Sequence, residues 1–203
     1  MKKQLRGIKR STFLYDFDLY RVKVPMQDSP GNYLSVIDMT PEDVTQTIVF
    51  LHGYAGAAES FERQINHFAP QFRVIVPDLR GHGQSDAPYS QYTIQEIISD
   101  IEAIVTHLNL PDKFILVGHS FGGSISVEYA NKHPEKIEKL VLMATAGEYP
   151  APGIVRYFSK VPTRPFRPLW RYRPRWDAEL HVMKRMAYNC LLKWQGWNLL
   201  RNL

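Results

Sequence analysis

The sequence predicts an α/β fold in which a mostly parallel sheet carries helices on both faces. Two observations lead to this prediction. Short apolar runs that suit buried strands alternate along the chain with longer segments whose apolar residues recur at helical spacing. Parallel strands need a crossover of a dozen or more residues between them, and a helix usually supplies it. With 203 residues and 44% hydrophobic content, the chain can bury a sizeable core.

The first predicted elements form an antiparallel hairpin at the edge of the sheet. Segments 19–24 and 33–38 alternate apolar and polar residues, and the turn-rich segment 27–32 joins them. The runs 47–51 and 72–76 are short, largely apolar and without alternation. Strands buried on both faces have that pattern, so both runs are predicted to be central parallel strands.

Helices are predicted between and after these strands. Segments 57–68 and 93–108 carry apolar residues at helical spacing. The apolar run 113–117 predicts another buried strand, and a helix is expected to follow it over 122–132. The run 139–144 is the last clear strand, and it is expected to be buried as well.

The turn between strand 113–117 and the next helix holds the main candidate for chemistry. It has the sequence Gly-His-Ser-Phe-Gly-Gly over 118–123. A turn this abrupt strains the backbone of Ser120. Gly118 and Gly122 let the strand and the helix approach each other closely, so that the Ser120 hydroxyl projects outward. A serine beside glycines can also be an ordinary turn or helix cap. The buried strand before it and the helix after it favour a nucleophile elbow.

Three segments together resemble the α/β-hydrolase superfamily over about residues 15–147. They are Leu-His-Gly-Tyr at 51–54, Asp-Leu-Arg-Gly-His-Gly-Gln-Ser at 78–85, and the elbow. The resemblance is to the esterase- and lipase-like branch with a serine nucleophile. Relatives that open epoxides or haloalkanes carry a carboxylate at the elbow, where this chain has Ser120.

The resemblance implies an oxyanion hole made by two backbone N–H groups, those of Tyr54 and Phe121. Gly53 would let the first of these loops approach closely. His119 supports the elbow but is not expected to be the base, because side chains adjacent on a sharp turn diverge and the base must reach the Ser120 hydroxyl.

Segment 78–85 is interpreted as structural, with Arg80 and the nearby Asp86 as candidates for ion pairs. The sharper alternative is a catalytic role for Asp78 or His82. In the superfamily, however, the catalytic acid and histidine follow the serine in the sequence, which disfavours this alternative.

A serine nucleophile needs a histidine base and an orienting carboxylate. The superfamily places the acid after the sixth or seventh strand and the histidine after the eighth, whereas the sixth is the last clear strand here. Asp177 and His181 are weak candidates, since their i, i+4 spacing is more often a helix-surface contact. The favoured hypothesis is a chain that lacks its C-terminal strands, with acid and base beyond Leu203.

Composition changes near residue 148 and predicts two parts. Residues 1–147 would form the hydrolase core with its first six strands, and 148–203 a helical cap or lid. Residues 151–203 carry eleven Lys and Arg against two acidic residues, a net charge of +9, and all four tryptophans. Peripheral contact of 151–203 with an anionic membrane is therefore a hypothesis. No nucleic-acid-binding motif accompanies this charge, so no nucleic-acid partner is expected.

The expected function is cleavage of a carboxylic ester, such as a lipid or other apolar acyl ester, through an acyl-enzyme. The small-molecule ester is the expected partner, and neither cofactor nor metal is expected. An acyltransferase, a C–C bond hydrolase, a cofactor-free peroxidase of the same fold, and a non-catalytic scaffold or membrane-docking protein remain alternatives. No secretory signal or spanning segment is recognised, and with a single cysteine, Cys190, a cytoplasmic location is expected.

Overall fold

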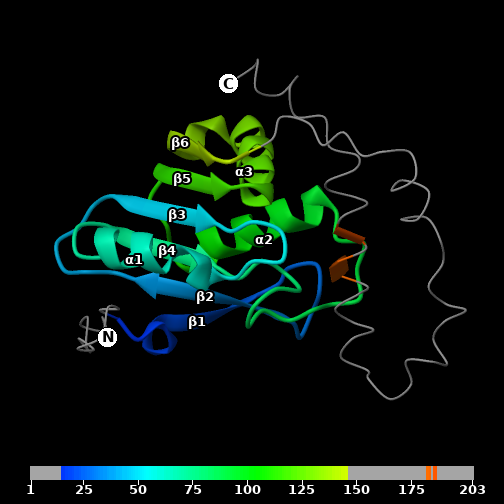
Figure 1. Cartoon of the computed structure of the whole chain (residues 1–203). Coiled ribbons are helices and arrows are strands. Elements are labelled where there is room, and N and C mark those ends of the chain that lie inside the picture. Colours follow the sequence, from blue (N-terminus) through cyan, green and yellow to red (C-terminus); the bar gives the residue numbers. More distant parts are fainter. Residues whose placement is uncertain (1–14, 146–181, 184, 187–203) are drawn as a thin grey trace, which may run out of the picture.

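The structure is a computed structural model that describes residues 15–145 together with 182, 183, 185 and 186. Its centre is a six-stranded sheet of order β1-β2-β4-β3-β5-β6 (Figure 1). β1 and β2 pair antiparallel, as do β2 and β4, while the other neighbours are parallel. The predicted mostly parallel sheet is confirmed. The strands are β1 (Arg21–Pro25), β2 (Tyr33–Met39), β3 (Thr47–Leu51), β4 (Arg73–Pro77), β5 (Phe114–His119) and β6 (Ile137–Met143).

Helices cover both faces of the sheet. The α-helices are α1 (Glu62–Phe68), α2 (Ile94–His107) and α3 (Phe121–Lys132), and the 3₁₀ helices are η1 (Phe17–Tyr20), η2 (Ala58–Phe61) and η3 (Pro134–Lys136). Every residue of β3 is buried, and its side chains alternate between two cores. Ile48 and Phe50 pack in the core that contains α1, whereas Val49 and Leu51 pack in the core that contains α2 and α3. This two-sided burial explains the unbroken apolar run.

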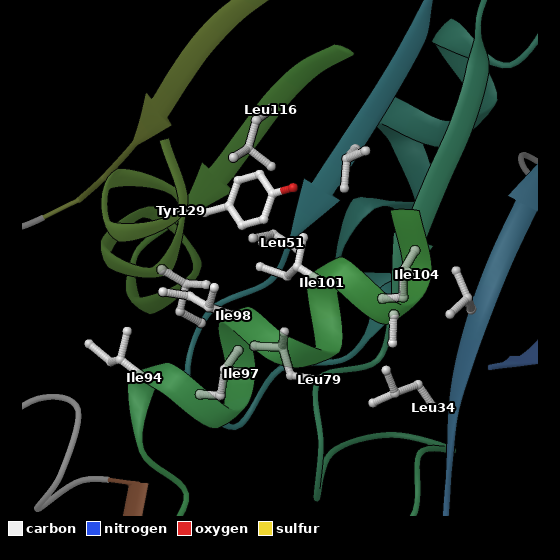
Figure 2. Close-up of a cluster of buried hydrophobic side chains, with 14 of the residues drawn as sticks. Leu34, Leu51, Leu79, Ile94, Ile97, Ile98, Ile101, Ile104, Leu116 and Tyr129 are labelled. Atoms are coloured by element: carbon white, nitrogen blue, oxygen red, sulfur yellow. The ribbon is translucent and has the colours of Figure 1, made fainter. Parts of the chain in front are cut away.

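The larger core lies between the sheet and the helices α2 and α3. Figure 2 shows Ile101 of α2 next to Leu51 of the sheet, in a cluster that also contains Leu116 and, from α3, Tyr129. A reciprocal cap starts α2. The Thr93 hydroxyl accepts the Glu96 N–H at 3.2 Å, and the Glu96 carboxylate accepts the Thr93 N–H at 2.6 Å. The predicted helix 93–108 is therefore confirmed.

Two predictions need correction at the sheet edges. Residues 17–20 form the 3₁₀ turn η1 instead of starting the first strand, because this turn brings Phe17 and Tyr20, three residues apart, to one buried side. The last strand was predicted to be buried, but Val141 is 41% and Leu142 36% exposed. The only strand that β6 pairs with in the described part of the sheet is β5, so one flank of β6 lacks neighbours there.

The predicted cap segment falls almost entirely outside the described residues. Its four described residues are helical, and Val182 and Met186 are buried in the core of α2 and α3. Within residues 15–145 and these four, no helix is long and apolar enough to cross a membrane.

Candidate active site

Ser120 lies between β5 and α3 with a backbone that few residues adopt. Its φ is 53° and its ψ −115°, a conformation that costs about 1–3 kcal/mol and persists only where the surroundings impose it. Here the Ser120 N–H donates to the Met143 carbonyl oxygen at 2.8 Å, and the Ser120 carbonyl oxygen accepts the Gly123 N–H at 3.0 Å. Hydrogen bonds from β6 and α3 thus hold the strained turn that the sequence predicts.

Glycines on either side of Ser120 allow the chain to pack this tightly. A methyl group added at Gly122 would overlap the Leu51 carbonyl oxygen of β3. One added at Gly118 would overlap the backbone of α3 at Gly122 and the Ser126 hydroxyl. Since most of these obstacles are backbone atoms, no rotamer change would relieve them. The close approach of β3, β5 and α3 therefore depends on these glycines.

The loop after β3 reaches the same place. The Gly56 N–H donates to the Gly53 carbonyl oxygen at 3.0 Å, which closes a tight turn, and Ala55 at its third position has a φ of 55°. A methyl group at Gly53 would lie 3.4 Å from Cβ of Ser120 and 3.1 Å from Nδ1 of His119. The backbone of this loop thus lies against the elbow, where a side chain at position 53 would crowd His119.

Tyr54 connects this loop to two other parts of the chain. Its ring packs edge-on against Phe121, the first residue of α3, with centroids 6.4 Å apart and an interplanar angle of 87°. Its hydroxyl donates to the Met183 carbonyl oxygen at 2.8 Å. Burial raises the pKa of the Tyr54 phenol, which keeps the hydroxyl protonated as a donor. The residues whose backbone N–H groups are the oxyanion-hole candidates, Tyr54 and Phe121, are therefore neighbours in space.

The segment after β4 has a structural arrangement at Asp78. This buried carboxylate accepts the backbone N–H groups of Ala58 at 2.7 Å and Gln84 at 3.0 Å, and it pairs with the Arg21 guanidinium at 2.8 Å. With three donors from the protein itself, this carboxylate joins η2, β1 and the segment after β4. The geometry supports the structural interpretation of this segment.

Arg80 in the same segment forms ion pairs, as the sequence predicts. Its fully buried guanidinium binds Asp100 of α2 at 2.7 Å and Asp28 of the β1–β2 turn at 2.9 Å. Burial raises the pKa of Asp100 to about 6, although the Arg80 charge acts in the opposite direction. Asp86, the other candidate for an ion pair, accepts the Tyr33 backbone N–H at 2.8 Å.

The contact between His52 and His82, near the elbow, is a feature that the sequence did not reveal. His52 is fully buried at the end of β3, and its ring lies 5.3 Å from that of His82, between centroids. Burial is the main cause that lowers the pKa of His52 to about 4, and it also lowers the pKa of His82. Both rings are therefore neutral at neutral pH. A polar residue that ends a fully apolar strand was the available signal for His52.

The candidates for acid and base are not brought together by the described residues. Asp177 and His181 lie outside them, so their proposed role stays a prediction. His119 points its Nδ1 towards Gly53 and belongs to the elbow itself. In the part of the chain that the structure describes, no group of three or more His, Cys, Asp or Glu side chains is suited to hold a metal ion.

This chain belongs to the α/β-hydrolase fold family, because the family model described as "alpha/beta hydrolase fold" matches residues 46–179. Among curated proteins, it is 35% identical over 122 residues to a 1-acylglycerol-3-phosphate O-acyltransferase from Arabidopsis thaliana, covering 58% of this chain and 29% of that protein. It is 34% identical over 128 residues to Epoxide hydrolase 4 from Mus musculus, covering 62% and 34%.

Solved structures show the same fold. An esterase from Exiguobacterium antarcticum superimposes with a TM-score of 0.64 at 22% identity, covering 86% of this chain and 74% of that one. The chain spans between 29% and 50% of the length of the first curated relatives that it matches. Relatives with this fold thus include proteins named as an esterase, an epoxide hydrolase and an acyltransferase.

Proposed function

We propose that this chain carries the nucleophile and the oxyanion hole of a serine hydrolase that cleaves carboxylic esters of apolar acyl groups. One observation carries the proposal. The strained backbone of Ser120 sits against the turn after β3, which comes so close that a methyl group at Gly53 would lie 3.4 Å from Cβ of Ser120. A partly exposed serine next to two backbone segments that can offer N–H groups is the arrangement that acyl transfer requires.

The reaction would proceed in two halves. The Ser120 hydroxyl oxygen attacks the ester carbonyl carbon while a base removes its proton, and the carbonyl oxygen takes the electron pair as an oxyanion. The N–H groups of Tyr54 and Phe121 would donate to this oxyanion, each contributing about 3 kcal/mol to the transition state. The intermediate expels the alcohol, which receives the proton, and water then releases the acid from the acyl-enzyme by the same steps.

The acid and base of this mechanism would come from outside the described residues. Phe121 is the first residue of α3, and the first N–H groups of a helix have no partner within that helix. Its place in the helix therefore supports the assignment of the Phe121 N–H as an oxyanion donor. The proposed cap over 148–203, and contact of 151–203 with an anionic membrane, remain proposals that rest on composition alone. A cytoplasmic location is likewise a proposal.

Opening of an epoxide is disfavoured even though two of the curated relatives are named epoxide hydrolases. That reaction would need a carboxylate at the elbow, as noted for such relatives above, and Ser120 occupies this position. Acyl transfer to an alcohol is the second candidate, and a specific observation favours it. The Arabidopsis relative, 35% identical to this chain, is named an O-acyltransferase. Such an enzyme would use the same acyl chemistry with an alcohol in place of water as the acceptor. Product analysis with competing alcohols separates transfer from hydrolysis.

Hydrolysis of p-nitrophenyl esters of increasing acyl length tests the proposal. The assay compares the wild-type protein with Ser120→Ala. Ser124→Ala is the matched control, since this buried serine lies one turn further along α3 and its hydroxyl has no hydrogen-bond partner among the described residues. Loss of hydrolysis in Ser120→Ala alone would support the proposal. Equal hydrolysis in wild type and Ser120→Ala would reject the role of Ser120, and no hydrolysis above background in wild type would favour the non-catalytic scaffold.

A further inference from the structure

The partners of His52 define how its ring is protonated. Its Nε2 lies 3.0 Å from the backbone nitrogen of Leu79, and its Nδ1 lies 2.8 Å from the carbonyl oxygen of Gly53. A backbone N–H can only donate, so Nε2 must be the unprotonated acceptor. The single ring proton is then on Nδ1, which donates to the Gly53 oxygen. Both ring nitrogens are thereby committed to backbone groups.

The Gly53 carbonyl and the Tyr54 N–H belong to one peptide plane. No cis peptide occurs among the described residues, and in a trans peptide these two groups point in opposite directions. The Gly53 oxygen accepts two hydrogen bonds, from His52 Nδ1 at 2.8 Å and from the Gly56 N–H at 3.0 Å. Fixing the oxygen on one side therefore fixes the direction of the Tyr54 N–H on the other.

His82 acts on the next peptide of the same loop. Its Nε2 accepts the Ala55 N–H at 3.2 Å, and its Nδ1 donates to the Arg80 carbonyl oxygen at 3.1 Å. Each of the two loops thus offers a histidine that accepts an N–H from the other loop. We call His52 and His82 the histidine clasp. It holds the loop after β3 against the segment after β4, and the Gly53 backbone faces Ser120.

We propose that His52 is a positioning residue that aims the Tyr54 N–H at the oxyanion by holding the Gly53–Tyr54 peptide plane, with His82 securing the peptide that follows. This inference rests on the proposed function, and it adds the device that orders one half of the oxyanion hole. His52 acts through the backbone and does not touch the substrate. Preorganisation of this kind matters because a donor that must reorient during the reaction stabilises the transition state less.

Two substitutions separate the bonds that His52 makes. In His52→Asn, the amide nitrogen takes the place of Nδ1 and can still donate to the Gly53 oxygen, while the acceptor for Leu79 is lost. In His52→Gln, the amide oxygen takes the place of Nε2 and can still accept the Leu79 N–H, while the donor to Gly53 is lost. The two variants therefore remove one hydrogen bond each, and only His52→Gln weakens the hold on the Gly53–Tyr54 peptide plane, which keeps the single bond from the Gly56 N–H.

The direction of the Tyr54 N–H is measured first, by residual dipolar couplings of the ¹⁵N-labelled protein. We expect the Tyr54 coupling to change in His52→Gln and to stay at the wild-type value in His52→Asn, with the couplings of α2 as the internal reference. An unchanged coupling in His52→Gln, or an equal change in both variants, would overturn the positioning role. This readout requires no activity, so it remains decisive if the proposed function fails.

Ester hydrolysis by the full-length protein then measures the consequence. Loss of one oxyanion donor lowers kcat by about 100- to 1,000-fold, so a misdirected donor in His52→Gln should lower kcat by up to about 100-fold with little change in KM. His52→Asn should keep kcat within several-fold of wild type at a matched unfolding midpoint. Equal kcat losses in both variants would indicate a purely structural histidine. An unaffected kcat in His52→Gln, while Ser120→Ala is inactive, would show that the aim of this N–H is irrelevant.

Discussion

Acid should destabilise this protein through His52, and the size of the effect follows from its environment. Burial lowers the pKa of His52 to about 4, whereas the ordinary value, expected in the unfolded chain, is 6.5. The neighbouring His82 acts in the same direction, while the Gly53 carbonyl and the Asp78 carboxylate oppose it. Between these two values the unfolded chain takes up a proton that the folded protein excludes, so stability falls as pH falls.

The stabilisation is complete above pH 6.5 and is lost as pH approaches 4. At 1.36 kcal/mol for each unit of pKa difference, wild type should lose about 3 kcal/mol by pH 4 through this group alone. His52→Gln does not titrate, and at neutral pH it lacks only the hydrogen bond to Gly53, worth about 1 kcal/mol. The variant should therefore be the less stable protein at pH 7.5 and the more stable one at pH 4, with equality at about pH 6.

Urea unfolding of both proteins at half-unit steps from pH 7.5 to 4 provides the measurement. The difference between their free energies of unfolding isolates His52, because the other titrating groups are common to both. A difference that stays constant over this range would refute the reasoning, since it would mean that His52 has the same pKa in the folded and unfolded states.

Three further predictions concern packing around the site. Gly122→Ala should lower the thermal midpoint strongly and cost at least about 3 kcal/mol in urea unfolding, because the methyl group would overlap a β3 carbonyl oxygen; a cost under 1 kcal/mol would contradict the packing. Asp100→Asn should cost about 3 kcal/mol at pH 7.5, since it leaves the buried Arg80 charge partly unpaired, and an unchanged urea midpoint would argue against the ion pair. Tyr54→Phe should remove the hydrogen bond to the Met183 carbonyl oxygen and lower the free energy of unfolding by about 1 kcal/mol. Amide hydrogen exchange in 182–186 should then be faster than in wild type, and unaltered exchange there would exclude this contact.

Local patterns were sufficient to predict most of the fold. The unbroken apolar runs at β3 and β5 reflect burial on both faces, and the helical spacing in 93–108 reflects one buried face of α2. These signals depend on residues close together in sequence. The strain at Ser120 was predictable for the same reason, because the turn and its glycines occupy six consecutive positions.

The rest of the site depends on contacts that no local pattern contains. His52 and His82 are 30 positions apart, and they meet only because β3 and β4 are parallel neighbours whose ends lie at one edge of the sheet. The exposure of Val141 likewise follows from which strands flank β6, whereas the strand's own sequence is apolar enough for a buried position. Both the contact between His52 and His82 and the exposure of Val141 therefore depend on which strands lie next to each other in the sheet.

The central claim is that Ser120 is an activated nucleophile, and covalent labelling tests it most directly. The full-length protein is treated with a fluorophosphonate probe at pH 7.5, digested, and the labelled peptide is located by mass spectrometry, with Ser120→Ala and Ser124→Ala treated in parallel. We expect a single adduct on Ser120, retained in Ser124→Ala and absent from Ser120→Ala. An unlabelled Ser120 in a folded full-length protein, or an adduct that persists in Ser120→Ala, would contradict it.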